Sequence, residues 1–160
     1  MPVEPDAFRA ALGRFPSGVT VVTFDEDDGS VHGITVSSFV SLSLNPPLVG
    51  VAIGHRARAH DMIGAPSFAV SVLAAHQAIV SDHFAARPVA LPADPFEDLA
   101  GHKVVRGAAA QIVCEVVDRV DTGDHTLLVG RVEASRVAAD ASLAYQAGRY
   151  GHVVVDEPVG

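Results

Sequence analysis

Small hydroxyl side chains gather in the stretch GITVSSFVSLSLNPPLVGVAI, which spans residues 33–53. Thr35, Ser37 and Ser38 end a run typical of a β-strand, where a globular domain usually places branched apolar residues. Such small side chains let a flat group approach the backbone, and hydroxyls and peptide N–H groups can bond to an acceptor-rich ring edge. The alternative is an ordinary strand end and turn, which these residue types commonly form.

A basic cluster, GHRARAH, follows directly at residues 54–60. Arg56 and Arg58 stand with two histidines where a predicted strand gives way to a predicted helix. Because the whole chain has only 11 lysines and arginines, this concentration could hold an anion. The alternative is a solvated basic turn on an acidic protein.

A histidine beside an aspartate opens the segment GDHTLLVGRV at residues 123–132. A neutral His125 at a turn that enters a strand could donate a proton or pack against a flat ring. The alternative is a turn histidine that bonds to its own hairpin.

Motifs for several other chemistries are missing from the sequence. It contains no His-Glu-x-x-His and no Cys-x-x-Cys, so we expect no bound metal. The glycine patterns of dinucleotide-binding folds and P-loops are absent, as is the Gly-x-Ser-x-Gly of esterases. Cys114, the single cysteine, is interpreted as a small core residue.

The elements that must position these residues are mostly strands. Alternation and β-branched content predict strands at residues 17–24, 31–36, 48–53, 67–73, 108–120 and 126–137, and an edge strand within 145–155. Helices are expected at residues 8–15, 58–64 and 74–86, and a long loop at 87–101. Short turns join most strands, which favours a single domain over residues 1–160, mainly β with short helices and a closed antiparallel sheet or small barrel.

Composition excludes several classes of partner. The chain has 160 residues, a net charge of −8 and a pI near 5.3, so it lacks the basic footprint of nucleic-acid and membrane-surface binding. The N-terminus does not resemble a signal peptide, and no apolar run approaches the roughly 20 residues that span a bilayer. We therefore expect a cytoplasmic protein that binds neither nucleic acid nor membrane.

Taken in order, the motifs resemble the short-chain flavin reductase family, which has the antiparallel FMN-binding split β-barrel fold. The resemblance runs from about residue 8 to residue 150. The matching phrases are FRAALGRFPSGVTVVT, GITVSSFVSLSLNPPLVGVAI, RAHDMIGAPSFAVSVLAAHQAIVSDHFA, GAAAQIVCEVV, GDHTLLVGRV and YQAGRYG.

This resemblance implies a set of site residues. It places a Thr-x-Ser-Ser segment along the flavin ring, a phosphate loop after the next strand, two residues that flank the flavin, a histidine near the nicotinamide and a C-terminal segment close to the same cleft. These are, in that order, Thr35, Val36, Ser37 and Ser38; Arg56, Ala57, Arg58 and Ala59; Ser81 and Phe84; His125; and Arg149 and Tyr150. Ala57 and Ala59 stand where relatives usually carry hydroxyls, which predicts weaker retention of FMN.

The family also implies a homodimer that transfers hydride from NADH or NADPH to FMN or FAD. His125 would position the nicotinamide, and reduced flavin would pass to a partner flavin-dependent monooxygenase. Two alternatives remain open: a non-catalytic flavin carrier, and a reductase that retains its flavin and serves another acceptor.

Overall fold

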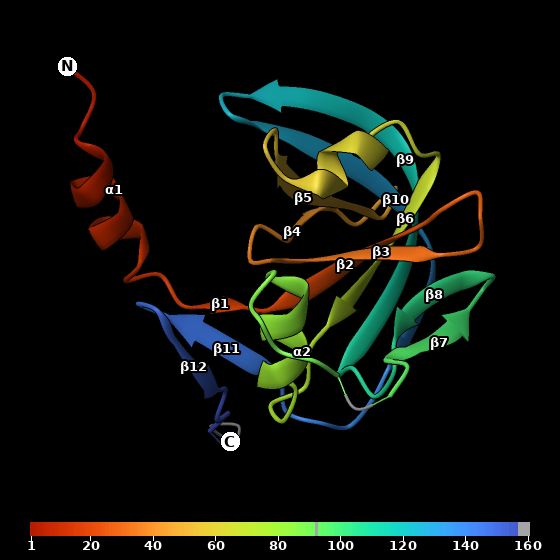
Figure 1. Cartoon of the computed structure of the whole chain (residues 1–160). Helices are drawn as coiled ribbons and strands as arrows, with labels where there is room; N and C mark the ends of the chain where they lie inside the picture. The colour runs from red at the N-terminus through yellow and green to blue at the C-terminus, as the bar shows by residue number, and fades with distance from the viewer. Residues whose placement is uncertain (92, 157–160) are drawn as a thin grey trace.

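A computed structural model of the chain describes residues 1–91 and 93–156 (Figure 1). Its helices are α1 (Pro5–Leu12), the 3₁₀ helix η1 (Arg58–Met62) and α2 (Ala78–Phe84). Its strands are β1 (Ser17–Gly18), β2 (Thr20–Asp25), β3 (Val31–Val36), β4 (Val40–Ser43), β5 (Leu48–Gly54), β6 (Ser67–Val72), β7 (Phe96–Leu99), β8 (His102–Val105), β9 (Ala110–Thr122), β10 (His125–Val137), β11 (Leu143–Gln146) and β12 (Arg149–His152).

Seven strands form the main antiparallel sheet, in the order β3-β2-β6-β9-β10-β5-β4. The two outermost strands, β3 and β4, are neighbours in the chain but not in the sheet, so the curved sheet has a split between them. Figure 1 shows β3 running between α2 and the helical turn that follows β5. The mainly β architecture with a split antiparallel barrel, expected from the sequence, is confirmed.

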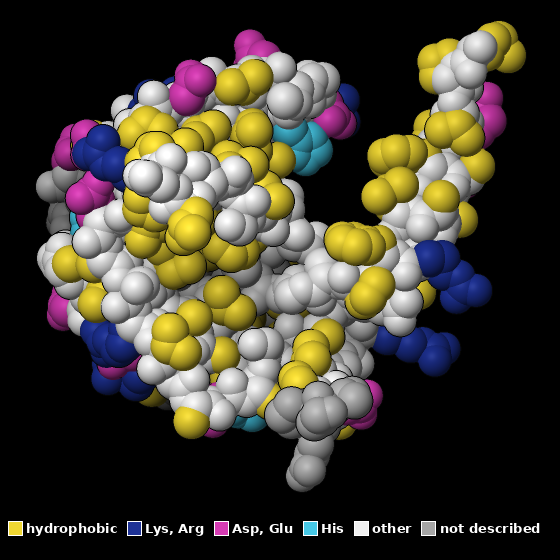
Figure 2. Space-filling model, turned by 180° about the vertical axis from the view of Figure 1, so that it is seen from behind, with side chains coloured by type: hydrophobic (Ala, Val, Ile, Leu, Met, Phe, Trp, Pro, Cys, Tyr) yellow, Lys and Arg dark blue, Asp and Glu magenta, His cyan; other side chains and the backbone are white. Residues whose placement is uncertain are grey.

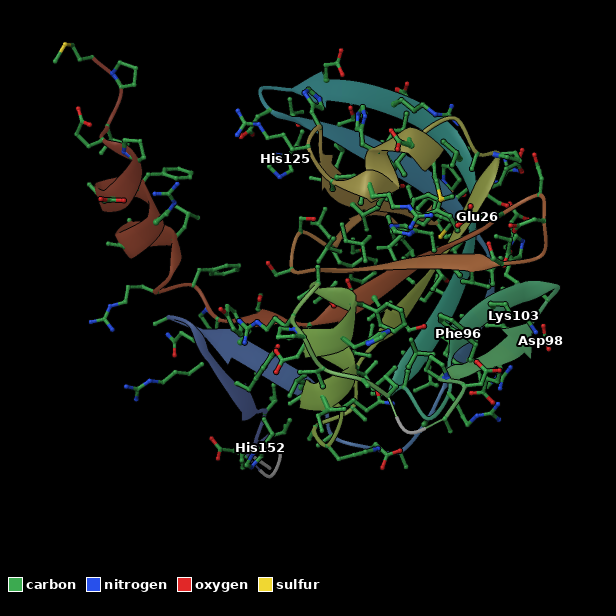
Figure 3. All side chains as sticks on the ribbon, in the orientation of Figure 1. Glu26, Phe96, Asp98, Lys103, His125 and His152 are labelled. Atoms are coloured by element: carbon green, nitrogen blue, oxygen red, sulfur yellow. The ribbon has the colours of Figure 1, made fainter. Side chains whose placement is uncertain are left out.

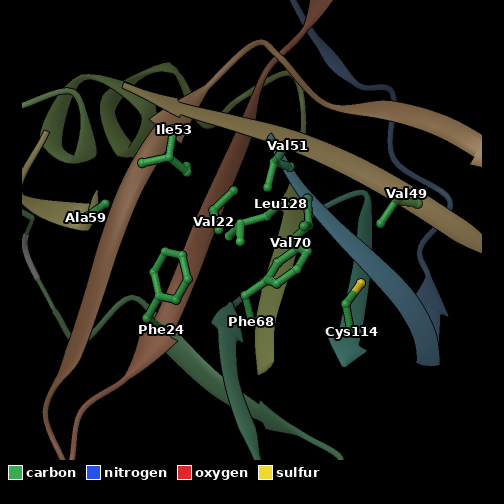
Figure 4. Packing of buried hydrophobic residues seen from close by; sticks show 10 residues of the cluster. All are labelled: Val22, Phe24, Val49, Val51, Ile53, Ala59, Phe68, Val70, Cys114 and Leu128. Atoms are coloured by element: carbon green, nitrogen blue, oxygen red, sulfur yellow. The ribbon is translucent and has the colours of Figure 1, made fainter. Parts of the chain in front are cut away.

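The core lies inside this curved sheet. Figure 4 shows Val22 and Phe24 of β2 packed with Val51, Phe68 and Leu128 of β5, β6 and β10, and each is at most 1% exposed. This packing also requires a glycine, Gly130, on β10. A Cβ at position 130 would lie 2.6 Å from the Phe68 ring and 2.7 Å from Cβ of Cys114, so only glycine fits against them. Residues of high β propensity and one small gap therefore determine the core.

Smaller units surround the barrel. β7 and β8 form a separate hairpin, and β1 joins β11 and β12 in a three-stranded sheet. α1 stands away from the body, and none of its residues is buried. Figure 2 shows apolar side chains on this arm and a visible gap between it and the rest of the molecule. No helix in the described part of the chain is long and apolar enough to cross a membrane.

The helices differ most from the sequence predictions. Residues 58–64 form a short 3₁₀ helix, because the bonds from His60 to Ala57 and from Ile63 to His60 span three residues rather than four. The helix expected at 74–86 begins only at Ala78, because Gln77 closes a turn by accepting the Ala74 N–H with its side-chain oxygen. The helix expected at 8–15 covers Pro5–Leu12.

Two strand predictions also need correction. The supposed loop at 87–101 contains β7, and the single edge strand expected at the C-terminal end is the hairpin of β11 and β12. Both hairpins turn on Ala-Gly pairs, Ala100–Gly101 and Ala147–Gly148, whose φ angles are all positive. Positive φ at both central residues is the signature of a type I′ hairpin turn. β4 was not expected at all.

Candidate flavin and nicotinamide site

Two adjoining hollows lie along β3, and Thr35 lines both of them. The smaller encloses about 170 Å³ and is bounded by β3, α2 and the C-terminal hairpin. The larger encloses about 680 Å³ and is bounded by β3, α2 and the loop after β5. Because β3 is an edge strand, part of its backbone N–H and C=O groups point away from the sheet and can bond to a ligand.

The smaller hollow is lined by Thr35, Val36 and Ser37 from β3 and its exit, and by Ser81 and Tyr150 from the opposite side. The Thr35 hydroxyl donates to the Ser81 carbonyl at 2.7 Å, which joins β3 to α2. Five residues that were predicted to bind the flavin, from distant parts of the sequence, therefore line the same hollow.

Tyr150 connects the C-terminal hairpin to α2. Its hydroxyl donates to Asp82 Oδ1 at 2.6 Å and lies 2.9 Å from Ser81 Oγ. Burial and the bond to Asp82 raise the pKa of Tyr150, so the phenol keeps its proton. Arg87 forms an ion pair with the same carboxylate at 3.1 Å. This network places a neutral phenol, whose proton bonds to Asp82, and a guanidinium on the lining of the smaller hollow.

The larger hollow has an aromatic wall laid directly on the backbone of β3. A Cβ at Gly33 would lie 2.6 Å from Cδ1 and Cε1 of Phe84, so the ring packs where any side chain would stand. The opposite wall is the loop of Arg56, Ala57 and Arg58. An aromatic face and two exposed guanidinium groups thus border one cavity.

The loop after β5 combines exposed charge with buried apolar residues. Ala59 is fully buried in the core cluster, and Ala57 packs against that cluster. Arg58 is 74% exposed in its side chain and lies 3.9 Å from Glu26, a loose ion pair that leaves the guanidinium accessible. The alanines therefore secure the loop to the barrel while the arginines face the hollow.

His125 opens β10 directly opposite Gly54, at the end of β5. Its Nδ1 lies 2.7 Å from Asp124 Oδ1, and this bond together with the histidine's charge lowers the pKa of Asp124. A Cβ at Gly54 would lie 3.5 Å from His125 Nε2, so the ring lies over that glycine. Figure 3 shows His125 at the β9–β10 turn, and its pairing with Gly54 places it beside the start of the basic loop.

Two predicted residues have other neighbours. The Ser38 hydroxyl donates to the Ala52 carbonyl at 2.9 Å and accepts the Ala52 N–H at 3.1 Å. Arg149 is exposed on β12 and lines a separate hollow, which shares Tyr145 and Tyr150 with the smaller one. Their direct roles toward a flavin, like that of His125, stay predictions.

The hollows also include residues that the sequence analysis missed: His32, Gly33, His83, Arg87 and Tyr145. His32 and Gly33 belong to a strand that had been predicted, but only its last residues were considered. A glycine inside a β-strand pattern signals a close approach by another group, and this signal could have identified position 33. Within residues 1–91 and 93–156, no group of three or more His, Cys, Asp or Glu side chains is placed to hold a metal ion.

The residues present suit a flavin nucleotide. The Thr35 and Ser37 hydroxyls and the free edge of β3 match the polar edge of an isoalloxazine ring. The Phe84 ring, for which glycine leaves room, supplies an apolar surface, and two arginines suit a phosphate. Each part of the ligand thus has a chemically matched wall.

Comparison with known proteins identifies the family of the chain. Residues 12–153 match the flavin reductase-like domain family. An NADH-dependent flavin reductase of Rhodococcus sp is 40% identical, with 99% of this chain and 93% of the relative covered. The reductase component of a flavin-dependent trigonelline monooxygenase of Acinetobacter baylyi is also 40% identical, over 89% of this chain and 47% of that longer protein.

A solved structure extends the likeness to three dimensions. The NADH:FAD oxidoreductase SgcE6 of Streptomyces globisporus C-1027, in complex with NAD and FAD fragments, superposes with a TM-score of 0.87 at 32% identity and 99% coverage of both chains. The match over most of the chain, in sequence and in fold, shows that the protein is a member of the flavin reductase-like domain family.

Proposed function

We propose that this protein is an NADH-dependent reductase of free flavin. The observation that carries the proposal is the pair of adjoining hollows along β3, which share Thr35 and Ala85 and bring a hydroxyl-lined wall, an aromatic wall and a basic loop side by side. The full-length identity of 40% to an NADH-dependent flavin reductase supports the same activity. NADH rather than NADPH is proposed because the relative's name specifies it.

The chain's own residues bind and orient the two reactants. Thr35 and Ser37 would hold the polar ring edge, Phe84 would cover the apolar part, and Arg56 and Arg58 would hold the phosphate. A bound flavin supplies the hydride acceptor for the reduced nicotinamide. His125, at the end of β10, would position the nicotinamide, and Tyr150 would keep α2 and the C-terminal hairpin in place around the site.

The loop after β5 supports release of the flavin after reduction. Ala57 and Ala59 offer no hydroxyl to a phosphate, and a charge-assisted bond of that kind contributes about 1.5–3 kcal/mol. Either FMN or FAD would then bind transiently and leave to serve a monooxygenase. The Acinetobacter baylyi relative, a monooxygenase reductase component, supports such a partner.

A homodimer is part of the proposal. The arm formed by α1 and the residues after it exposes Phe8 by 54%, Leu12 by 52% and Phe15 by 74%. The three aromatic and aliphatic side chains have no cover within the described chain, and Figure 2 shows the arm separated from the body. A second copy of the chain would bury them. Sedimentation or light scattering of the wild type beside Phe15→Ser tests this, since the variant should shift toward monomer.

The activity is tested by mixing the purified protein with NADH and each of FMN, FAD and riboflavin. We expect rapid loss of the reduced nicotinamide absorbance in the presence of flavin. Flavin that binds without any oxidation of NADH would overturn the reductase and favour a carrier. Slow turnover of free flavin by a protein that purifies yellow would instead favour a reductase that retains its flavin.

The role of His125 has a matched control on the C-terminal hairpin. His125→Gln should lower kcat with NADH while the dissociation constant of FMN stays within about twofold of wild type. Neither histidine lines either hollow, but His152, labelled in Figure 3 on β12, is exposed and lies well away from His125 and the basic loop. His152→Gln should leave kcat unchanged. Equal activities of the two variants would remove His125 from the site.

A further inference from the structure

The larger hollow is lined by two histidines in addition to its two arginines. It is lined by His32 from β3, Arg56 from the loop after β5, Arg58 from the start of η1, and His83 from α2. The chain as a whole carries a net charge of −8, so this concentration runs against its composition. Its lining includes no aspartate and no glutamate. The hollow is therefore suited to a strongly anionic group.

The two histidines of the hollow differ in their bonding. His83 donates from Nδ1 to the Val89 carbonyl at 2.7 Å, and its ring packs edge-on against Phe84. The bond to Val89 and the contact with Phe84 hold the His83 ring in place. His32 is half-buried, and burial together with the positive charge of Arg58 lowers its pKa, with no hydrogen bond contributing. His32 is thus neutral near pH 7 and free to change its charge.

Charged groups surround His32 from each neighbouring element. Arg58 and Asp61 face it from η1 and Glu26 from the turn between β2 and β3, while Arg56 and His83 share its hollow. Glu26 and Asp61 raise the pKa of His32, but burial and Arg58 outweigh them. A doubly negative ligand placed among Arg56, Arg58 and His32 would add a charge that favours the imidazolium.

We propose that His32 is the third, pH-dependent cation of a phosphate site that it forms with Arg56 and Arg58, and that it reads the phosphate of a flavin nucleotide. The inference rests on the proposed function, because it takes the flavin as the ligand. A phosphate monoester carries close to two negative charges at pH 7. Its binding therefore drives a proton from solvent onto His32, with no covalent change.

The sign of the pH effect follows from this coupling. In the free protein the pKa of His32 lies below its ordinary value, and in the complex it rises. Proton uptake on binding means that affinity for FMN is highest at low pH and falls as pH rises through the bound-state pKa. The window from pH 6.5 to 8 isolates His32, because the phosphate of FMN loses its second proton near pH 6.

A diphosphate of NADH offers the same chemistry as the flavin phosphate. The two sources are separated by ligand: FMN has the phosphate, riboflavin is the same ring without it, and NADH brings phosphates without a flavin. Proton uptake with FMN alone assigns the site to the flavin. Uptake that appears only when NAD⁺, which carries the same diphosphate but no hydride to transfer, is added to the riboflavin complex would assign it to the dinucleotide and overturn the proposal.

The test is calorimetric titration of FMN and riboflavin at pH 7 in buffers of different ionisation enthalpy. Wild type should take up roughly half a proton more per FMN than His32→Gln, and its FMN dissociation constant should rise about threefold to tenfold from pH 6.5 to 8. His32→Gln and His32→Asn should show a flat profile. His76→Gln, at an exposed histidine outside the hollow, is the matched control and should behave as wild type.

The outcomes separate this inference from the proposed function. The same proton count for FMN in wild type and His32→Gln, with tight binding in both, would overturn the role of His32 and leave the reductase intact. The same pH dependence for riboflavin as for FMN would also overturn it. Failure of both flavins to bind the wild type would overturn the reductase and this inference together.

Discussion

β2 and β3 are paired residue by residue, yet they have opposite surroundings. Thr20 pairs with Val36 and Val22 with Ile34. β2 is buried over its first five residues, whereas every residue of β3 is only half-buried. The difference arises from position, because β2 lies between β3 and β6 while β3 ends the sheet. One strand builds the core, and its neighbour presents an edge to the hollows.

The amino-acid sequences of β2 and β3 differ in the same way. β2 reads TVVTFD, with branched and aromatic side chains that fill both faces. β3 reads VHGITV, and it carries the titratable ring of His32, a glycine without a side chain at position 33, and the hydroxyl of Thr35. Each of the three would weaken a core strand. Here Gly33 makes room for the Phe84 ring, Thr35 bonds to Ser81, and His32 lines the larger hollow. Substitutions in the core should therefore change stability, and those along the β3 hollows should change ligand binding.

The largest expected effect is in the core. Phe68 is fully buried and packs against Phe24, with ring centroids 6.4 Å apart. Phe68→Ala should lower the free energy of unfolding by about 3–5 kcal/mol, through lost burial and the cavity it leaves. Urea denaturation measures the loss, with the exposed Val137→Ala as control. The FMN dissociation constant of the folded fraction should stay near wild type, and a large rise would break the separation between core and site.

The basic loop should show the reverse pattern. Arg58→Ala removes an exposed guanidinium, so the free energy of unfolding should hardly change. If it bonds to the phosphate, the dissociation constant of FMN should rise about 10- to 100-fold, the equivalent of one charge-assisted hydrogen bond. Fluorescence titration with FMN and riboflavin measures this, with Arg131→Ala on β10 as the matched control. Equal losses for both flavins would exclude a phosphate role.

Sequence patterns predicted the strands of the main sheet better than the small hairpins around it. Strands such as β2 and β5 are determined by local alternation and β-branched content, and the structure has them at nearly the predicted bounds. The hairpins β7–β8 and β11–β12 were missed because Ala100 and Ala147 adopt positive φ, which sequence rules expect of Asn, Asp or Gly. Pairing across the sheet holds these turns, so tertiary context decides them.

The site shows the same limit. Thr35 was named from its residue type, but Ser81 and Tyr150 only through a family resemblance, and the structure brings the three together through two hydrogen bonds to Ser81. Residue spacing alone could not have joined them, because they lie in three elements far apart in the chain. His32 escaped notice because its significance depends on the basic loop across the hollow.

The third prediction concerns the glycine of β3. Gly33→Ala places a methyl group about where the Phe84 ring lies, so the ring must move. Overpacking of this kind costs about 1–3 kcal/mol, and here we expect it to appear as a roughly tenfold weaker affinity for flavin. Gly64→Ala is the control, because nothing lies within 4 Å of its Cβ position.

A double variant identifies the cause of that loss. Combining Gly33→Ala with Phe84→Ala keeps the added methyl but removes the ring that it displaces. If contact with Phe84 is the cause, the two changes should be less than additive in flavin affinity and in stability. Strict additivity would show that the methyl acts directly on the ligand or on the β3 backbone instead.

The smallest expected effect is at Ser38, beside the split between β3 and β4. The Ser38 hydroxyl bonds to both the N–H and the C=O of Ala52, so it joins the exit of β3 to the strand that leads into the basic loop. Ser38→Ala should lower the free energy of unfolding by about 1 kcal/mol, because the bridge is lost at an exposed place where water can replace it. The KM for flavin should rise only slightly, through a looser split. If Ser38→Ala instead leaves stability unchanged and raises KM severalfold, the Ser38 hydroxyl turns from Ala52 to the flavin on binding. Ser38 would then be a flavin-binding residue rather than a structural one.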